Sequence, residues 1–172
     1  MNLPNKLTCL RVIMIVPFVI LALMQSTSAQ IAAAVIYVLA CVTDLLDGYI
    51  ARSRNLITNF GKFMDPIADK LLVMSAMIVL VSDGRILPWA CIVILGREFI
   101  VSGFRLVAAE RGIVIAAALT GKLKTVFQMV ATLALLLLGR AWYTDLLFGI
   151  AVGLTVISGA EYVWKNREVL RG

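Results

Sequence analysis

Long apolar runs restrict the structures open to this chain more than any other feature. Six runs of roughly 18 or more mostly apolar residues follow one another, at positions 7–25, 30–52, 62–82, 86–109, 119–139 and 142–164. A run of this length crosses the hydrocarbon core of a bilayer as an α-helix. Hydrophobic residues make up 62% of the chain and charged residues only 15%, too few to cover a soluble globule. We therefore predict an all-α, polytopic membrane protein with six transmembrane helices.

The links between the runs are short, which predicts one membrane domain over residues 1–172. Gly84, Pro88, Gly112 and Gly139 lie between runs or at their ends, where such residues are typical of turns. The polar start MNLPNK is expected to form a short N-terminal interfacial segment that lies along the membrane before the first span. We expect the first run to be a retained span, because little charge precedes it.

Basic residues are distributed unevenly between the two ends of the predicted spans. Six spans place both termini on one side, and cytoplasmic termini put most Lys and Arg at cytoplasmic ends, with only Arg85 and Arg140 at outer ends. This asymmetry matches the positive-inside rule and predicts that both termini are cytoplasmic. A basic rim facing anionic lipid headgroups explains the net charge of +6, so no nucleic-acid partner is implied.

The segment DLLDGYIARSRNLITNFGKFMDPIAD, residues 44–69, carries charged and small residues between apolar stretches. Helical spacing places a set of marked residues on one face of the second span: Asp44, Asp47, Gly48, Ala51 and Arg52. A second set follows at four-residue intervals on the third span: Gly61, Asp65 and Asp69. A short turn would bring the two faces together near the cytoplasmic ends, so we expect the four carboxylates to converge on one pocket.

Four aspartates in membrane spans need neutralisation, since each costs about 2.5–3.5 kcal/mol at a bilayer centre. The chain has no histidine, which excludes Ser-His-Asp and Cys-His catalysis. An all-oxygen ligand set favours Mg²⁺, Mn²⁺ or Ca²⁺, and four carboxylates suffice for two ions. Two such ions suit phosphoryl or phosphatidyl transfer. A divalent-cation transporter is an alternative of a different class, disfavoured because all four aspartates crowd toward one membrane face.

The spacing Asp44-x2-Asp47-Gly48-x2-Ala51-Arg52-x8-Gly61-x3-Asp65-x3-Asp69 resembles the signature of the CDP-alcohol phosphotransferases, membrane enzymes of phospholipid synthesis. Within that family, the segments NLPNKLTCLRV, GREFIVSGFR and GKLKTVFQM are similar to the bacterial phosphatidylglycerophosphate synthases. The resemblance implies six transmembrane helices, a homodimer among membrane lipids and an active site open to the cytoplasm.

The resemblance also implies roles for single residues. The positions that would bind two divalent cations, Mg²⁺ or Mn²⁺, are Asp44, Asp47, Asp65 and Asp69, with Asp69 also the general base. The positions that would border the cytidine diphosphate group are Asp47, Gly48, Ala51, Arg52 and Gly61. The implied reaction is attack by the primary hydroxyl of sn-glycerol 3-phosphate on the β-phosphorus of CDP-diacylglycerol, which gives phosphatidylglycerol phosphate and CMP.

The remaining candidates lie outside the signature. A phosphorylated acceptor needs cationic side chains, and those near the cytoplasmic side of the fourth and fifth spans are Arg97, Arg105, Lys122 and Lys124. Lysines two residues apart point to opposite sides of a helix, so we expect only one to reach the site. Asn5, Thr8 and Arg11 contact the nucleotide if the N-terminal segment folds over the cytoplasmic mouth. Inositol phosphate, serine or phosphatidylglycerol remain alternative acceptors within the family.

Overall fold

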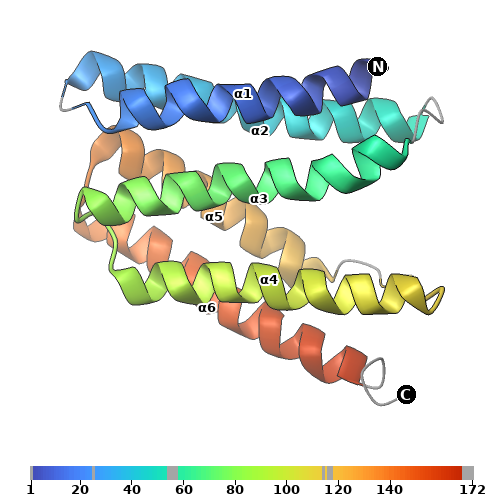
Figure 1. Cartoon of the computed structure of the whole chain (residues 1–172). Coiled ribbons are helices and arrows are strands. Elements are labelled where there is room, and N and C mark those ends of the chain that lie inside the picture. The colour runs from blue at the N-terminus through green and yellow to red at the C-terminus, as the bar shows by residue number, and fades with distance from the viewer. Residues whose placement is uncertain (1, 25, 54–57, 114, 116–117, 168–172) are drawn as a thin grey trace. The chain divides into compact units, whose positions relative to one another are not determined.

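The computed structural model describes residues 2–24, 26–53, 58–113, 115 and 118–167, without the side chains of residues 45, 47, 49, 51–53, 59 and 62. These residues form helices and no strand (Figure 1). The helices are α1 Leu3–Ala22, α2 Thr27–Ser53, α3 Asn59–Ser82, α4 Pro88–Glu110, α5 Leu119–Leu138 and α6 Trp142–Asn166. The all-α class predicted from the sequence is confirmed, and each predicted apolar run coincides with one helix.

The first helix begins earlier than the apolar pattern predicts. Asn2 is its N-cap, and the Asn2 side chain accepts a hydrogen bond from the Asn5 backbone N–H at 3.1 Å. Pro4 lies in the first turn, where its missing N–H leaves no partner unsatisfied. Helix formation therefore extends to Leu3, so the polar start belongs to the same helix as the first apolar run, and its location at the membrane interface stays a prediction.

Three helices end at glycines with left-handed backbone conformations. Gly84, Gly112 and Gly139 follow α3, α4 and α5 and have φ angles of 67°, 71° and 69°. Glycine adopts this conformation without the steric penalty that a Cβ atom brings, and it commonly terminates helices. The predicted turns at these positions are confirmed.

The chain forms two compact units, residues 1–84 and residues 85–172, here called the N-terminal and C-terminal units. In the N-terminal unit α1 contacts both α2 and α3, and α2 also contacts α3 (Figure 1). Alanines at 29, 33 and 40 of α2 are buried, which allows close helix approach. Phe18 of α1 packs on Tyr37 of α2, with ring centroids 5.8 Å apart. Toward the start of α1, the buried face of this helix carries polar residues, which belong to the candidate site.

In the C-terminal unit α6 contacts both α4 and α5. Buried alanines lie on all three helices, at positions 90, 108, 131 and 151. Phe104 of α4 meets Tyr162 of α6 edge-on, with ring centroids 6.1 Å apart. A single membrane domain over residues 1–172 stays a prediction, because each unit is compact by itself.

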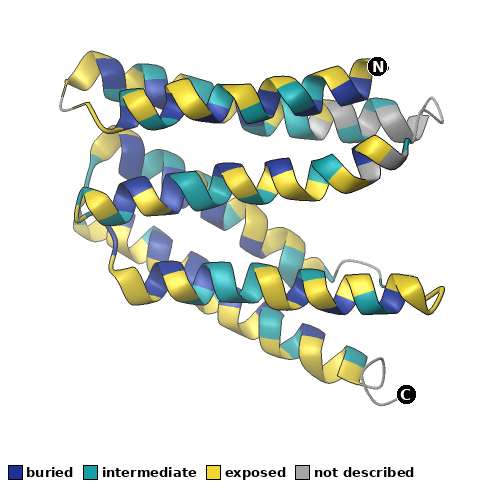
Figure 2. Cartoon of the chain, in the orientation of Figure 1, coloured by how far each residue is buried: buried dark blue, intermediate teal, exposed yellow. Residues whose placement is uncertain are grey.

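Large apolar side chains cover the outer faces of the helices. Ile13, Ile92 and Leu119 are 65%, 69% and 77% exposed, and exposed residues recur along each helix in Figure 2. Within the described part of the chain, four helical segments are long and apolar enough to cross a membrane: Leu3–Ala22, Thr27–Asp44, Leu119–Leu138 and Trp142–Asn166. The protein is therefore a multi-pass membrane protein whose exposed apolar side chains suit a lipid solvent.

The prediction of six transmembrane helices is met only in part. Helices α3 and α4, with 24 and 23 residues, are long enough to cross a membrane. Judged on the described residues, however, neither is apolar enough to be a candidate membrane span. Asp65, Asp69 and Lys70 interrupt α3, while Arg97, Glu98 and Arg105 interrupt α4. Asp65, Asp69, Arg97 and Arg105 are among the candidate functional positions.

Candidate active site

The predicted aspartates occupy the end of α2 and the first half of α3. Asp44 and Asp65 are partly buried, whereas Asp69 is exposed. The thiol of Cys41 on α2 lies close enough to both Asp44 and Asp69 to interact with their charges. One carboxylate from each helix therefore acts electrostatically on the same side chain of the N-terminal unit. The side chain of Asp47 falls outside the described residues.

Arg11 of α1 forms an ion pair with Asp44. Its Nη1 donates to the Asp44 Oδ1 at 2.5 Å, and the Arg11 side chain is fully buried while that of Asp44 is 39% exposed. A buried guanidinium needs an anionic partner, and its hydrogen bond in turn fixes the position of the carboxylate. α1 thus supplies a positive charge that offsets part of the acidic cluster.

Thr8 lies one turn earlier on α1 and contacts the other acidic helix. Its hydroxyl donates to the Asp65 Oδ1 at 2.7 Å, and the residue is fully buried. Because Arg11 and Thr8 are three residues apart, they share one face of α1 and reach α2 and α3 respectively. α1 therefore orients two carboxylates that belong to different helices.

Asn5 extends this polar face by one more turn. The Thr58 hydroxyl donates to the Asn5 Oδ1 at 2.9 Å and accepts the Gly61 N–H at 3.0 Å, which caps the start of α3. A Cβ atom at Gly61 would lie 3.3 Å from both side-chain oxygens and 3.6 Å from the Asp65 Oδ2. The backbone of α3 therefore approaches α1 closely beside Asp65, and glycine leaves the room for it.

The other predicted nucleotide-binding positions remain predictions. Gly48 lies on α2, and Ala51 and Arg52 have side chains outside the described residues. Thr58 was not among the residues predicted from the sequence. A threonine directly before a helical run is a common N-cap, and that signal would have located it.

The predicted acceptor residues belong to the C-terminal unit, where the structure separates them into two environments. Lys124 of α5 is buried and pairs with Glu98 of α4, and the Glu98 Oε1 also accepts from the Arg97 Nη1 at 3.2 Å. Lys122 is exposed, as expected for one of two lysines on opposite sides of a helix. Arg105 is exposed and stacks over the Tyr162 ring, 5.9 Å from its centroid.

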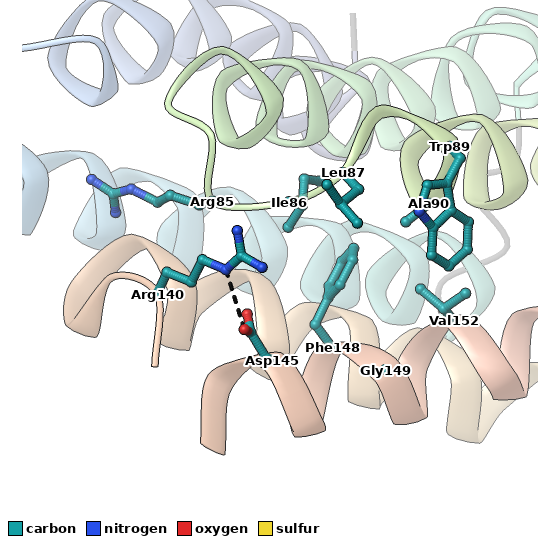
Figure 3. A pocket seen from close by; sticks show the side chains of 10 residues that line it. All are labelled: Arg85, Ile86, Leu87, Trp89, Ala90, Arg140, Asp145, Phe148, Gly149 and Val152. Atoms are coloured by element: carbon teal, nitrogen blue, oxygen red, sulfur yellow. Dashed lines mark hydrogen bonds and ion pairs between the residues drawn. The ribbon is translucent and has the colours of Figure 1, made fainter. Parts of the chain in front are cut away.

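A cavity of about 250 Å³ lies elsewhere in the C-terminal unit and contains none of the predicted site residues (Figure 3). Apolar side chains of α4, of α6 and of the segment before α4 line most of it, including Trp89, Phe148 and Val152. Its charged groups have structural partners, because Arg140 pairs with Asp145 at 3.2 Å and Arg85 donates to the Leu135 carbonyl at 2.6 Å. We therefore do not assign this cavity to the candidate active site.

Comparison with known protein families decides the class of this site. Residues 1–157 match the family model described as CDP-alcohol phosphatidyltransferase. The chain belongs to this family. The resemblance seen in the aspartate spacing is therefore confirmed.

Several curated relatives within the CDP-alcohol phosphatidyltransferase family are similar to the chain over nearly its full length. A Bacillus subtilis (strain 168) protein named CDP-diacylglycerol--glycerol-3-phosphate 3-phosphatidyltransferase is 44% identical, over 99% of this chain and 97% of its own. An Escherichia coli (strain K12) protein of the same name is 41% identical, over 98% and 97%. A probable phosphatidylglycerophosphate synthase of Mycobacterium tuberculosis (strain ATCC 25618 / H37Rv) is 43% identical, over 99% and 84%.

CDP-alcohol phosphatidyltransferases generally use divalent cations. The acidic cluster offers only oxygen donors, with Asp44 and Asp65 already oriented by α1, and such a set fits Mg²⁺, Mn²⁺ or Ca²⁺. Among the side chains that the structure describes, no three metal-binding groups stand together closely enough to hold one ion, and Asp47 is not among them. The cation site itself therefore stays a proposal.

Proposed function

We propose that this transferase moves the phosphatidyl group of CDP-diacylglycerol to sn-glycerol 3-phosphate and releases CMP. The observation that carries the proposal is the 41–44% identity to relatives named for this reaction, over nearly the full length of both chains. A lipid-linked donor also explains why carboxylates and buried cations lie on helices of a membrane protein. The paired Arg97 and Lys124 suit a phosphorylated acceptor better than serine.

The reaction exchanges one phosphorus–oxygen bond for another. The primary hydroxyl oxygen of the acceptor forms a bond to the β-phosphorus, and the bond from that phosphorus to the bridging oxygen breaks, so CMP leaves with the electron pair. The hydroxyl proton goes to Asp69, whose exposed carboxylate is accessible to an incoming substrate. Asp69 is therefore the proposed general base.

The four aspartates Asp44, Asp47, Asp65 and Asp69 would hold two divalent cations, Mg²⁺ or Mn²⁺. When bound, these cations supply positive charge that stabilises the diphosphate and the developing negative charge. The chain's own contribution is to orient the ligands: Arg11 holds Asp44 and Thr8 holds Asp65. These contacts support the assignment because they fix carboxylates of two helices at one end of the N-terminal unit.

The nucleotide site is proposed at the same end. Its residues are Asp47, Gly48, Ala51, Arg52, Gly61, Asn5 and Thr8. The close approach of Gly61 to Asn5 and Asp65 supports it, because it brings predicted nucleotide-binding positions of α1 and α3 next to a predicted metal ligand. The acceptor phosphate is proposed to bind Arg97 and Lys124, with Arg105 and Lys122 as the outer members of that predicted set.

We further propose that all six helices cross a bacterial cytoplasmic (inner) membrane, with both termini and the active site on the cytoplasmic side, and that the protein forms a homodimer. The excess of Lys and Arg at the predicted cytoplasmic ends supports this orientation. Charges within α3 and α4 are compatible with spanning helices when they face a bundle interior rather than lipid.

One assay of purified protein in detergent tests the proposal. CDP-diacylglycerol is supplied with sn-glycerol 3-phosphate, inositol phosphate, serine or phosphatidylglycerol, each with and without a chelator, and CMP release is measured. We expect release with sn-glycerol 3-phosphate alone, and its loss with chelator. Release with a different alcohol would replace the proposed acceptor, while uptake of a divalent cation into proteoliposomes without CMP release would favour a transporter.

Asp69→Asn is the matched catalytic test, with Asp145→Asn as a control carboxylate in the other unit. We expect Asp69→Asn to abolish CMP release while the variant still inserts and purifies, because the amide cannot accept the proton. Asp145 is 44% exposed and pairs only at the surface with Arg140, so its variant should retain activity. Near-normal turnover by Asp69→Asn would reject the base assignment.

A further inference from the structure

Two glycines of the C-terminal unit enclose the side chain of Arg97. A Cβ atom at Gly159 of α6 would lie 3.0 Å from the Arg97 Cγ, and one at Gly121 of α5 would lie 3.2 Å from its Nη2. The side chain therefore runs from a contact with α6 near its base to a contact with α5 at its tip. Contacts below about 3.4 Å are tighter than ordinary packing, so any added methyl group must displace Arg97.

The backbone of these two positions does not by itself require glycine. Gly121 lies in the first turn of α5 and Gly159 in the interior of α6, and neither is among the glycines with positive φ. Glycine is the poorest helix former after proline, so the presence of Gly159 in a helix interior needs another reason. For comparison, a Cβ atom at Gly149 or Gly153 of α6 would meet nothing within 4 Å. The space beside Arg97 is the reason that the structure offers.

Arg97 lies in a cluster where two cations share one carboxylate. Arg97 and Lys124 both donate to the same Glu98 oxygen, and their side chains are only 13% and 3% exposed. The Arg97 Nε is buried and has no hydrogen-bond partner among the described residues. Arg97 and Lys124 bring two positive charges to the one negative charge of Glu98, so these three side chains together carry a net positive charge, and the Arg97 Nε–H adds a buried donor. Those properties suit an additional anionic group such as a phosphate.

We propose that Gly159 and Gly121 are positioning residues that set the orientation of the Arg97 guanidinium for the phosphate of the acceptor. The proposal rests on the proposed function, which assigns the acceptor phosphate to Arg97 and Lys124. Gly159 acts on the inner end of the side chain, where a small displacement of Cγ becomes a larger one at the guanidinium. Gly121 acts on the flexible outer end, which yields more easily. The two glycines thus determine selectivity for a phosphorylated alcohol.

Gly159→Ala tests the proposal, and Gly153→Ala on the same helix is the matched control. We expect Gly159→Ala to raise the KM for sn-glycerol 3-phosphate about tenfold, the effect of losing one well-oriented charge-assisted contact. The kcat and the KM for CDP-diacylglycerol should stay within about twofold, because the acidic cluster is unchanged. Gly153→Ala should leave all three constants unchanged, and Gly121→Ala should raise the acceptor KM less than Gly159→Ala does.

A double variant separates positioning from a general packing defect. If Gly159 acts through Arg97, then adding Gly159→Ala to Arg97→Gln should raise the acceptor KM no further. Independent, multiplicative effects would overturn the proposal, as would an unchanged KM in Gly159→Ala. If Gly159→Ala does not fold, Gly121→Ala with Arg97→Gln provides the same cycle. Failure of the unaltered protein to use sn-glycerol 3-phosphate would instead refute the proposed function.

Discussion

Replacing Arg11 by methionine is the most direct test of how α1 supports the acidic cluster. Methionine retains most of the buried apolar stem but removes the charge that Asp44 contacts at 2.5 Å. Breaking a fully buried ion pair costs about 3–5 kcal/mol, but Asp44 is 39% exposed and water can replace part of the lost contact. A charge-assisted hydrogen bond contributes about 1.5–3 kcal/mol, so we expect a loss near 2 kcal/mol.

The loss is measured as a change in thermal unfolding of the purified protein, followed by intrinsic fluorescence in detergent. For a chain of this size, about 2 kcal/mol corresponds to a fall in Tm of roughly 4–8 °C. Lys6→Met is the control, because Lys6 lies on the same helix and is exposed. Its Tm should change by less than about 1 °C, in line with the small energies of exposed charges.

A divalent cation should have the opposite effect on the thermal stability of Arg11→Met. Without Arg11 the carboxylates repel one another more strongly, so Mn²⁺ should raise the Tm of Arg11→Met by more than it raises that of the unaltered protein. Adding Asp44→Asn should remove most of the cost of Arg11→Met, since no charge is then left unpaired. Strictly additive effects of the two substitutions, within about 0.5 kcal/mol, would refute the ion-pair reasoning.

Two further substitutions test contacts of the separate units. Thr8→Val keeps the shape of the side chain but removes its hydrogen bond to Asp65 from a fully buried site, so the free energy of unfolding should fall by about 1–2 kcal/mol. Thr125 is exposed, so the control Thr125→Val should leave the free energy of unfolding nearly unchanged. An unchanged Tm in Thr8→Val would contradict that contact. Arg85→Met removes the hydrogen bonds to the last carbonyls of α5, so the free energy of unfolding should fall by about 1–2 kcal/mol with kcat unaltered. Arg140 is exposed, so Arg140→Met should change the free energy of unfolding by less than about 1 kcal/mol. Equal Tm values for the two arginine variants would exclude the capping role of Arg85.

The sequence predicted the family and the helices because those depend on local spacing. The aspartates recur at three- and four-residue intervals, and this spacing alone places them on helical faces. The turn glycines could also be predicted from the sequence, since a positive φ strongly favours glycine wherever it occurs. The start of α1 was predicted wrongly, because hydropathy marks the apolar run at residue 7, whereas the Asn2 cap and Pro4 begin the helix at Leu3.

The partners of each polar side chain depended on tertiary structure. Nothing in the sequence distinguishes Lys124 from Lys122, and only packing of α5 in its unit buries the first beside Glu98 and exposes the second. The contact between Gly159 of α6 and Arg97 of α4 joins positions that lie 62 residues apart in the sequence. In a membrane protein the lipid-facing and buried sides of a helix are both apolar, so hydropathy does not show which side meets another helix. Local spacing therefore determined which residues share a face, and helix packing decided what each face contacts.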